Sequence, residues 1–184
     1  MAAICVFCAS SGTVDPRWTG LAAEVGLALA ARGHSLVSGG GQVGMMGAVC
    51  RGARAGGAPT FGVIPEALMA LEVADRDSDD LVVTRDMAER KTVMMDKADG
   101  FLVLPGGIGT LDELFEVWTT AALGMHRKPV VLLNVDDFYT GLLQWLKQLA
   151  LAGFVRPPAL DMLVIADSVA VALDAFEQEP DWTT

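Results

Sequence analysis

The stretch FLVLPGGIGTLDE, residues 101–113, decides the fold. Its first four residues are apolar, as in a buried strand, and a helical pattern begins at Thr110. The turn between them contains Pro105, Gly106, Gly107 and Gly109. A strand that passes through a tight glycine turn into a helix is typical of a sheet with parallel strands.

The same turn has the features of an anion-binding site. Glycines let the backbone bend so that successive N–H groups point into one concavity, and the start of the following helix adds the positive end of its dipole. A phosphate group is the natural occupant of such a turn. No Gly-Lys-Ser/Thr sequence follows, which excludes the P-loop that binds nucleoside triphosphates.

Short apolar runs alternate with longer helical patterns along the chain. Strands are expected at residues 4–8, 35–37, 60–64, 81–84, 101–104, 130–134 and 162–165. Helices are expected at residues 16–32, 44–55, 87–97, 110–123 and 139–151, with a short one after residue 168. This alternation predicts an α/β fold, a doubly wound parallel sheet of about seven strands with helices on both faces. With 184 residues, the chain is expected to form a single domain, 1–184.

A second glycine-rich turn, residues 38–47, follows the second expected strand. Gly39, Gly41 and Gly44 match the pattern G-x-G-x-x-G. A dinucleotide-binding unit would also need an acidic residue that closes a later strand, but Glu66 begins a new segment. Two interpretations stay open: a tight turn that lets a helix pack closely on the sheet, and a second ligand-binding turn.

Glu113 and the pair Arg90-Lys91 are the candidate functional side chains. Thr110 and Glu113 have the spacing of a capping box, in which the carboxylate only binds a backbone amide. Alternatively, Glu113 stands at the crevice, one turn from the anion-binding turn. Lys91 interrupts an apolar stripe of its expected helix, with Arg90 beside it. These long side chains either extend past apolar neighbours to solvent or reach an anionic group in the crevice.

The composition limits the partners of the protein. Asp and Glu outnumber Lys and Arg by 23 to 13, and the net charge of −10 repels phosphate backbones, so no nucleic-acid partner is expected. No run of about 20 apolar residues is present, and no basic residue precedes Arg17. The sequence therefore predicts no membrane span and a cytoplasmic location.

Metal and redox sites are not expected. His34 and His126 are the only histidines, and neither lies near a cysteine or near the other histidine. Cys5 and Cys8 have the spacing of a redox or zinc motif, but residues three apart on a strand point to opposite faces. Buried thiols are the favoured interpretation.

Several stretches of the chain resemble the Lonely Guy family of cytokinin-activating proteins. The resemblance rests on Arg90-Lys91, on PGGIGTLDE at 105–113, and in order on ICVFCASS at 4–11, GGG at 39–41, GMMG at 44–47, GVIP at 62–65, KPV at 128–130 and LN at 133–134. It covers nearly the whole chain. The resemblance implies a Rossmann-like phosphoribohydrolase that cleaves the N-glycosidic bond of a cytokinin riboside 5′-monophosphate, releasing the free base and ribose 5-phosphate. Family members also accept AMP.

The resemblance also implies roles for individual residues. By matching motif positions, Arg90 and Glu113 would be the catalytic pair. The implied substrate-binding residues are Glu72, Lys91, Gly106, Gly107, Gly109, Thr110, Leu111, Asp112 and Thr119, and the turns after the first two strands add Ser11, Gly39 and Gly40. The implied partner is a small nucleoside 5′-monophosphate, with no cofactor and no metal. Because family members are usually dimers whose sites include residues of both subunits, a homodimer is expected.

The chain departs from the usual family pattern in three places. Asp112 stands where Glu is common, Ile108 stands where an aromatic residue is common, and residues 75–80 form an acidic stretch. The glycines of the turn and Glu113 are unchanged. The departures concern how the base and its N6 substituent are held, and not the class of reaction.

Other functions fit parts of the pattern. Carrier proteins for the molybdenum cofactor have a similar fold and hold phosphate without hydrolysis, which makes a non-hydrolytic binding protein the main alternative. A dehydrogenase would need the ribose-binding acid that this sequence lacks. The label lysine decarboxylase, attached to this family, requires a lysine that forms a Schiff base in a pyridoxal site. None of the lysines lies in such a setting: Lys91, Lys97, Lys128 and Lys147.

Overall fold

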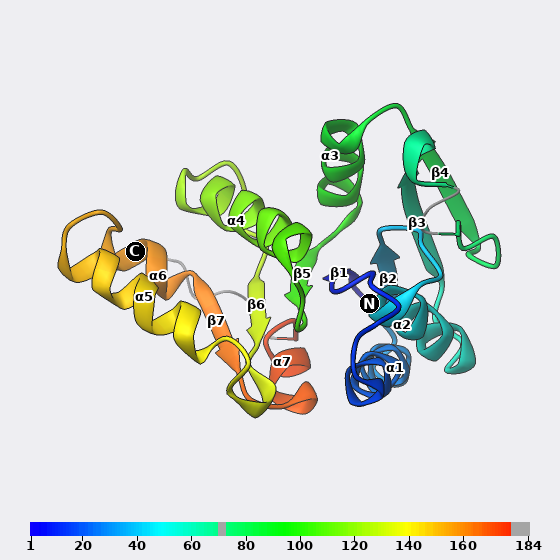
Figure 1. Ribbon diagram of the computed structural model, residues 1–184, viewed down its shortest axis with the longest axis horizontal. Helices are drawn as coiled ribbons and strands as arrows, with labels where there is room; N and C mark the ends of the chain where they lie inside the picture. Colours follow the sequence, from blue (N-terminus) through cyan, green and yellow to red (C-terminus); the bar gives the residue numbers. More distant parts are fainter. Residues whose placement is uncertain (70–72, 178–184) are drawn as a thin grey trace.

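A seven-stranded parallel sheet forms the centre of the computed structural model, which describes residues 1–69 and 73–177 (Figure 1). The strands are β1 (Ala3–Phe7), β2 (Ser35–Ser38), β3 (Thr60–Pro65), β4 (Asp80–Thr84), β5 (Gly100–Val103), β6 (Val130–Leu133) and β7 (Leu163–Ala166). All neighbouring pairs are parallel, in the order β4-β3-β2-β1-β5-β6-β7. The predicted α/β fold, a doubly wound parallel sheet, is confirmed.

Helices cover both faces of the sheet (Figure 1). On one face lie α1 (Pro16–Ala31), α2 (Gly44–Ala55) and α7 (Val169–Asp174). The other face is covered by α3 (Met87–Lys97), α4 (Ile108–Ala122), α5 (Thr140–Leu151) and α6 (Pro157–Asp161). Ile4 and Val6 of β1 pack beneath the first group, whereas Phe7 packs beneath the second, as side-chain alternation along a strand requires.

The cysteines are buried and free, as the sequence predicted. Cys5 packs into the core beneath α3 and α4, and Cys8 packs into the core on the opposite face. Burial raises the pKa of both thiols well above the usual value, so both are protonated at neutral pH.

Among residues 1–69 and 73–177, no cluster of His, Cys, Asp or Glu has an arrangement that would hold a metal. None of the helices described there has the length and apolarity to cross a membrane.

Glycines allow α1 and α2 to pack with their backbones in contact. A Cβ atom at Gly26 would overlap the carbonyl oxygen of Val49, and one at Gly52 would overlap that of Ala23. Glycine inside a helix costs about 1 kcal/mol relative to alanine. Here the cost is offset by a close helix–helix contact that any side chain would prevent.

The structure differs from the sequence prediction at several boundaries. Helix α4 begins at Ile108 with Gly107 as its N-cap, two residues before the expected start. Of the two interpretations of Glu113, the capping box with Thr110 is therefore wrong, because Thr110 is the third residue of the helix. β6 ends one residue early, and β7 is shifted by one residue. Three short helices were not predicted, because they span too few residues for a periodic pattern: η1 (Glu66–Leu68), η2 (Val135–Asp137) and α6.

A buried ion pair anchors the segment that follows η1. The Asp75 side chain is fully buried, and its carboxylate accepts hydrogen bonds of 2.7 and 3.2 Å from Arg54 on α2. Beside it, the N–H of Asp75 donates to the carbonyl of Gly40, and the N–H of Gln42 donates to that of Val73. These bonds fasten residues 73–75 to the turn after β2, at the carboxyl end of the sheet.

Replacing Asp75 by Asn is expected to destabilise the fold in a pH-dependent way. Burial tends to raise the pKa of Asp75, but hydrogen bonds and charge from Arg54 outweigh it, and the pKa lies below its usual value. The charged carboxylate therefore adds stability above the unfolded-state pKa of about 4, and this stability is lost as pH falls through the lower folded-state pKa.

Asp75→Asn should lower the free energy of unfolding by about 3 kcal/mol at pH 7. The deficit should shrink as pH falls from ~4 through the lower folded-state pKa, because the wild-type protein then loses the stability that its charged carboxylate adds. Urea unfolding of both proteins across this pH range measures the effect. A deficit that is the same at every pH would contradict the ion-pair explanation.

Candidate active site

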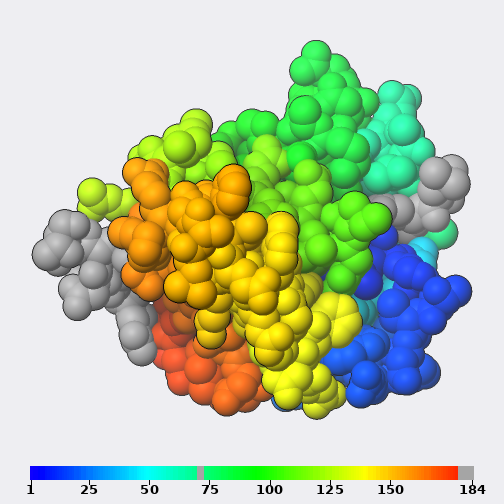
Figure 2. Space-filling model, turned by 60° about the vertical axis from the view of Figure 1, so that its left-hand side comes forward, coloured from blue at the N-terminus to red at the C-terminus, as the bar shows by residue number. Residues whose placement is uncertain are grey.

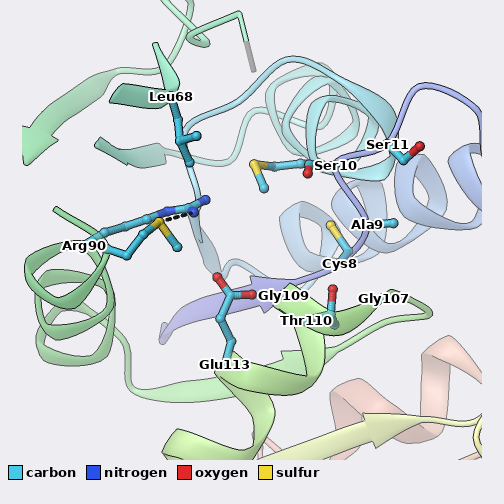
Figure 3. Close-up of a pocket in the computed structure, with 12 residues that line it drawn as sticks. Cys8, Ala9, Ser10, Ser11, Leu68, Arg90, Gly107, Gly109, Thr110 and Glu113 are labelled. Carbon is cyan, nitrogen blue, oxygen red and sulfur yellow. Dashed lines mark hydrogen bonds between the residues drawn. The ribbon is translucent and has the colours of Figure 1, made fainter. Parts of the chain in front are cut away.

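A cavity of about 270 Å³ opens at the carboxyl end of the sheet, where the strand order reverses between β1 and β5 (Figure 3). Ligands of open α/β sheets bind at this position. The lining residues come from five segments: residues 8–11 after β1, Met46 on α2, Leu68 on η1, Met87 and Arg90 on α3, and Gly107, Gly109, Thr110 and Glu113 at the start of α4.

The first turn of α4 gives the cavity a wall of backbone amides. The first helical bond runs from the N–H of Leu111 to the carbonyl of Gly107, at 3.0 Å. In the part of the chain that the structure describes, no group accepts a hydrogen bond from the N–H of Ile108, Gly109 or Thr110. These donors and the positive end of the helix dipole are the features that the sequence analysis expected of an anion-binding turn.

The second glycine-rich turn has a different role. At the start of α2, the N–H groups of Met45 and Met46 both donate to the carbonyl of Ala9, at 3.0 and 3.3 Å. Gly44 has a φ of +61°, and a Cβ atom there would overlap the carbonyl oxygen of Ser11. Because the chain itself occupies these donors, the turn matches the first of the two interpretations, a tight turn beneath a closely packed helix.

Arg90 is buried in the cavity wall. Its Nε donates to the carbonyl of Val63 at 3.2 Å, and its Nη2 donates to the carbonyl of Gly39 at 3.0 Å. A Cβ atom at Gly39 would overlap Nη2, so the guanidinium fits only because residue 39 has no side chain. The interpretation that Arg90 extends to solvent is wrong, since only 3% of its surface is exposed.

Glu113 faces the same cavity from the opposite wall. Its carboxylate projects from α4 towards the guanidinium of Arg90, with Cys8 on the β1 side of the cavity (Figure 3). Burial raises the pKa of the Cys8 thiol, and Glu113 adds to the effect, so the thiol does not act as a nucleophile at neutral pH. The site therefore combines a carboxylate, a guanidinium and a set of backbone N–H donors.

Lys91 lies outside the cavity lining. Its ammonium group pairs with Asp112 at 3.0 Å and with Glu116 at 2.6 Å, which joins α3 to α4. These acidic partners explain a lysine on the apolar stripe, and the sequence alone did not reveal them. Since Lys91 follows Arg90 and Asp112 precedes Glu113, the pair also fixes the distance between the helices that carry the two charged groups.

The remaining predicted site residues lie in different places. Gly39 and Gly40 lie in the turn behind Arg90, and the backbone of Gly106 faces Tyr139 instead of the cavity. Leu111 packs against the core, and Thr119 lines a separate groove between α4 and α5. Glu72 lies outside the described residues. The cavity brings together six of the predicted residues: Ser11, Arg90, Gly107, Gly109, Thr110 and Glu113.

Sequence reasoning missed part of the lining. Leu68, Met46 and Met87 reach the cavity from three separate elements, and nothing in their local pattern distinguishes them from core residues. Ser10 is different, because it stands in the turn after the first strand, where ligand-binding residues of such sheets occur. The position of Ser10 after the first strand could therefore have identified it as a cavity residue.

Comparison with protein families and known sequences gives a consistent result. Residues 46–176 match a family model described as "Possible lysine decarboxylase". A protein of Mycobacterium tuberculosis named cytokinin riboside 5′-monophosphate phosphoribohydrolase is 51% identical over 172 residues, which cover 94% of this chain and 91% of that protein. A protein of Arabidopsis thaliana with the same activity in its name is 42% identical over 180 residues, covering 97% and 83%.

Solved structures share the fold at lower identity. The X-ray structure of TM1055 has a TM-score of 0.74 at 25% identity, covering 97% of this chain and all of the other. The molybdenum cofactor carrier protein of Chlamydomonas reinhardtii has a TM-score of 0.71 at 25% identity, with 96% of both chains covered. The strand order and helical layers described above are therefore shared with proteins of known structure.

Inorganic phosphate is expected to bind at the start of α4 and not at the start of α2. In a ¹H–¹⁵N NMR titration, the amide resonances of Ile108, Gly109 and Thr110 should shift, because their N–H groups are available to the anion. Those of Met45 and Met46 should stay in place, since Ala9 already occupies them. Equal shifts at both helix starts would contradict this assignment.

Proposed function

This chain belongs to the family of cytokinin riboside 5′-monophosphate phosphoribohydrolases, and we propose that it hydrolyses such nucleotides to the free base and ribose 5-phosphate. One observation supports this function above others. The backbone amides at the start of α4, which have no acceptor within the helix, and the Glu113 carboxylate one helical turn later face a single cavity. A nucleoside monophosphate needs both, an anion-binding turn for its phosphate and an acidic group beside its ribose.

The polar and apolar groups that line the cavity determine how the substrate is oriented. The 5′-phosphate binds the amides at the start of α4, which places the ribose next to Glu113. The base then points away from α4, towards the apolar side chains of Leu68 and Met87. Arg90, fixed by two backbone carbonyls, orients the substrate from the α3 side.

Bond cleavage builds positive charge on the ribose ring. As the bond from C1′ to the base breaks, its electron pair leaves with the base, and a water oxygen forms the new bond to C1′. The Glu113 carboxylate stabilises the developing oxocarbenium ion and steers the water. One proton of the water stays on the new hydroxyl, and the other is passed to the base. Arg90 does not donate this proton, since a guanidinium group is not deprotonated in proteins.

The lysines of the described chain do not fit a pyridoxal site, whatever the label of the family model suggests. Lys91 is paired with Asp112 and Glu116, and Lys128 donates to the carbonyl of Met95 at 2.6 Å. Lys97 lies over the ring of Phe61. None of them lines the cavity, so no lysine is placed to form a Schiff base with a substrate bound there.

The proposal extends to a second substrate and to a compartment. The wall that holds the phosphate and the ribose does not contact an N6 substituent in this orientation, so AMP should also be hydrolysed. Three buried, free thiols suit a reducing compartment, which favours a cytoplasmic location.

Glu113→Gln is expected to bind nucleotide yet lose hydrolysis. The amide keeps the shape of the side chain but not the charge that stabilises the oxocarbenium ion, so turnover should fall about 10²-fold or more. Chromatography of base released from isopentenyladenosine monophosphate and from AMP measures turnover, and calorimetry with ribose 5-phosphate measures binding.

The matched control is Glu24→Gln, which neutralises an exposed carboxylate on α1 and should leave turnover unchanged. Near-normal turnover of Glu113→Gln would remove its catalytic role. A wild-type protein that binds nucleotide without releasing base would instead support the carrier alternative.

A homodimer is part of the proposal. An apolar groove between α4 and α5 has a volume of about 330 Å³ and is lined by Trp118, Trp145 and Leu149 among others. Figure 2 shows this face, where α5 (yellow) and the following segment (orange) lie beside α4 (green). Leu123, directly after α4, and Phe154, in the loop after α5, are 66% and 82% exposed. Such a surface is typical of a subunit contact.

Thr119 favours the same conclusion. The resemblance implies that it binds substrate, yet it lines this groove and not the cavity of its own chain. In a homodimer joined through the groove, Thr119 is available to the site of the other subunit.

Trp145→Glu should convert the homodimer to a monomer, because it places a charge in the apolar contact. Light scattering after size-exclusion chromatography gives the mass. Val171→Glu, which alters an exposed apolar residue on the opposite face, is the control and should stay dimeric. A monomeric wild-type protein, or a dimeric Trp145→Glu variant, would contradict this interface.

A further inference from the structure

The hydroxyl of Tyr139 contacts the glycine turn from behind. It donates to the carbonyl of Leu104, the residue that opens the turn, at 2.7 Å. Burial raises the pKa of this phenol. The backbone amide of Gly106 also interacts with the phenol oxygen, and this interaction lowers the pKa. One hydroxyl therefore interacts with the backbone on both sides of Pro105.

The fold fixes Tyr139 in this position. β5 and β6 are neighbours in the sheet, so the loop after β6 lies beside the turn after β5. Within that loop, the N–H of Tyr139 donates to the side-chain oxygen of Asn134 at 2.6 Å, and Asn134 in turn donates to Thr140 at 3.2 Å. The Tyr139 ring packs edge-on against Phe138 and is 3% exposed.

The other side of the turn is packed just as closely. A Cβ atom at Gly106 would overlap the side chain of Thr110, which is itself buried. The turn is thus held between Thr110 and Tyr139. Gly107, Gly109 and Thr110 line the cavity, whereas Tyr139 does not reach it.

We propose that Tyr139 is a positioning residue that sets the direction of the phosphate-binding amides, an inference that rests on the proposed placement of the 5′-phosphate at α4. Without the hydroxyl, the carbonyl of Leu104 loses its partner in a buried environment, and the turn relaxes towards other acceptors or water. Because Tyr139 touches neither ribose nor base, its loss weakens the hold on phosphate and leaves bond cleavage nearly intact.

Tyr139→Phe tests this role, since the ring and its packing stay while the hydroxyl is removed. We expect about a tenfold rise in KM for the nucleotide and in the inhibition constant of ribose 5-phosphate, with kcat within about threefold of the wild type. Thr60→Val is the matched control. It also removes a buried hydroxyl that donates and accepts one hydrogen bond, but it does so at the opposite end of the sheet.

A second measurement does not depend on the variant folding or on activity. Tyr139 is the only tyrosine of the chain, so incorporation of 3-fluorotyrosine places a single fluorine behind the turn. The ¹⁹F resonance of otherwise wild-type protein should shift on titration with ribose 5-phosphate and, in a separate titration, with inorganic phosphate. Glu113→Gln protein should give the same shift, because the phosphate contact does not require hydrolysis.

The outcomes separate this inference from the function on which it rests. If the wild type binds ribose 5-phosphate and Tyr139→Phe binds it equally tightly, the positioning role is overturned while the proposed function stands. A KM that rises equally in Tyr139→Phe and Thr60→Val would show a loss of stability only, and would also overturn it. A wild-type protein that fails to bind ribose 5-phosphate, with an unmoved ¹⁹F resonance, would refute the phosphate position and this inference together.

Discussion

The site depends on hydrogen-bond donors that the start of α4 leaves without an acceptor. Every helix begins with N–H groups that have no partner within the helix. At α2 the carbonyl of Ala9 takes two of them, and at α3 the Asp86 side chain accepts from Glu89. At α4 the N-cap is Gly107, which has no side chain with which to cap. A Ser, Thr or Asp there would satisfy the helix internally, so the glycine keeps these donors available to an anion.

The two charged groups are held in place by the residues next to them. Arg90 faces the cavity while Lys91 pairs with Asp112 and Glu116 on α4, and Glu113 faces the cavity directly after Asp112. Arg90 is further fixed to the ends of two strands through the carbonyls of Gly39 and Val63. Each helix thus presents one group to the cavity, and the ion pairs of the neighbouring residues set the distance between the helices. The shorter of the two acidic partners, Asp112, lies 3.0 Å from the Lys91 ammonium group.

The features that could be predicted from the sequence are those encoded within a single segment of the chain. The strands and the longer helices follow from periodicity and glycine placement, and the structure confirms them. The binding of an anion at the turn after β5 stays a prediction. The capping-box interpretation of Glu113 does not hold, because α4 begins at Ile108 with Gly107 as its N-cap, and the spacing of Thr110 and Glu113 does not fix that start. Contacts between distant segments had no local signal, as with Leu68 in the cavity and Tyr139 behind the turn. The role of Glu72 stays a prediction.

The placement of Glu113 so close to the anion-binding turn has an energetic consequence. In the proposed orientation of the substrate, the bound phosphate and the Glu113 carboxylate are both negative and lie about one helical turn apart, so they repel each other while the sugar is neutral. As the glycosidic bond breaks, positive charge appears on the ribose between them, and it is attracted to both. The same two groups therefore disfavour the bound substrate slightly and favour the transition state strongly, which is the condition for faster cleavage. A carrier that only stores its ligand would gain nothing from a carboxylate at this position.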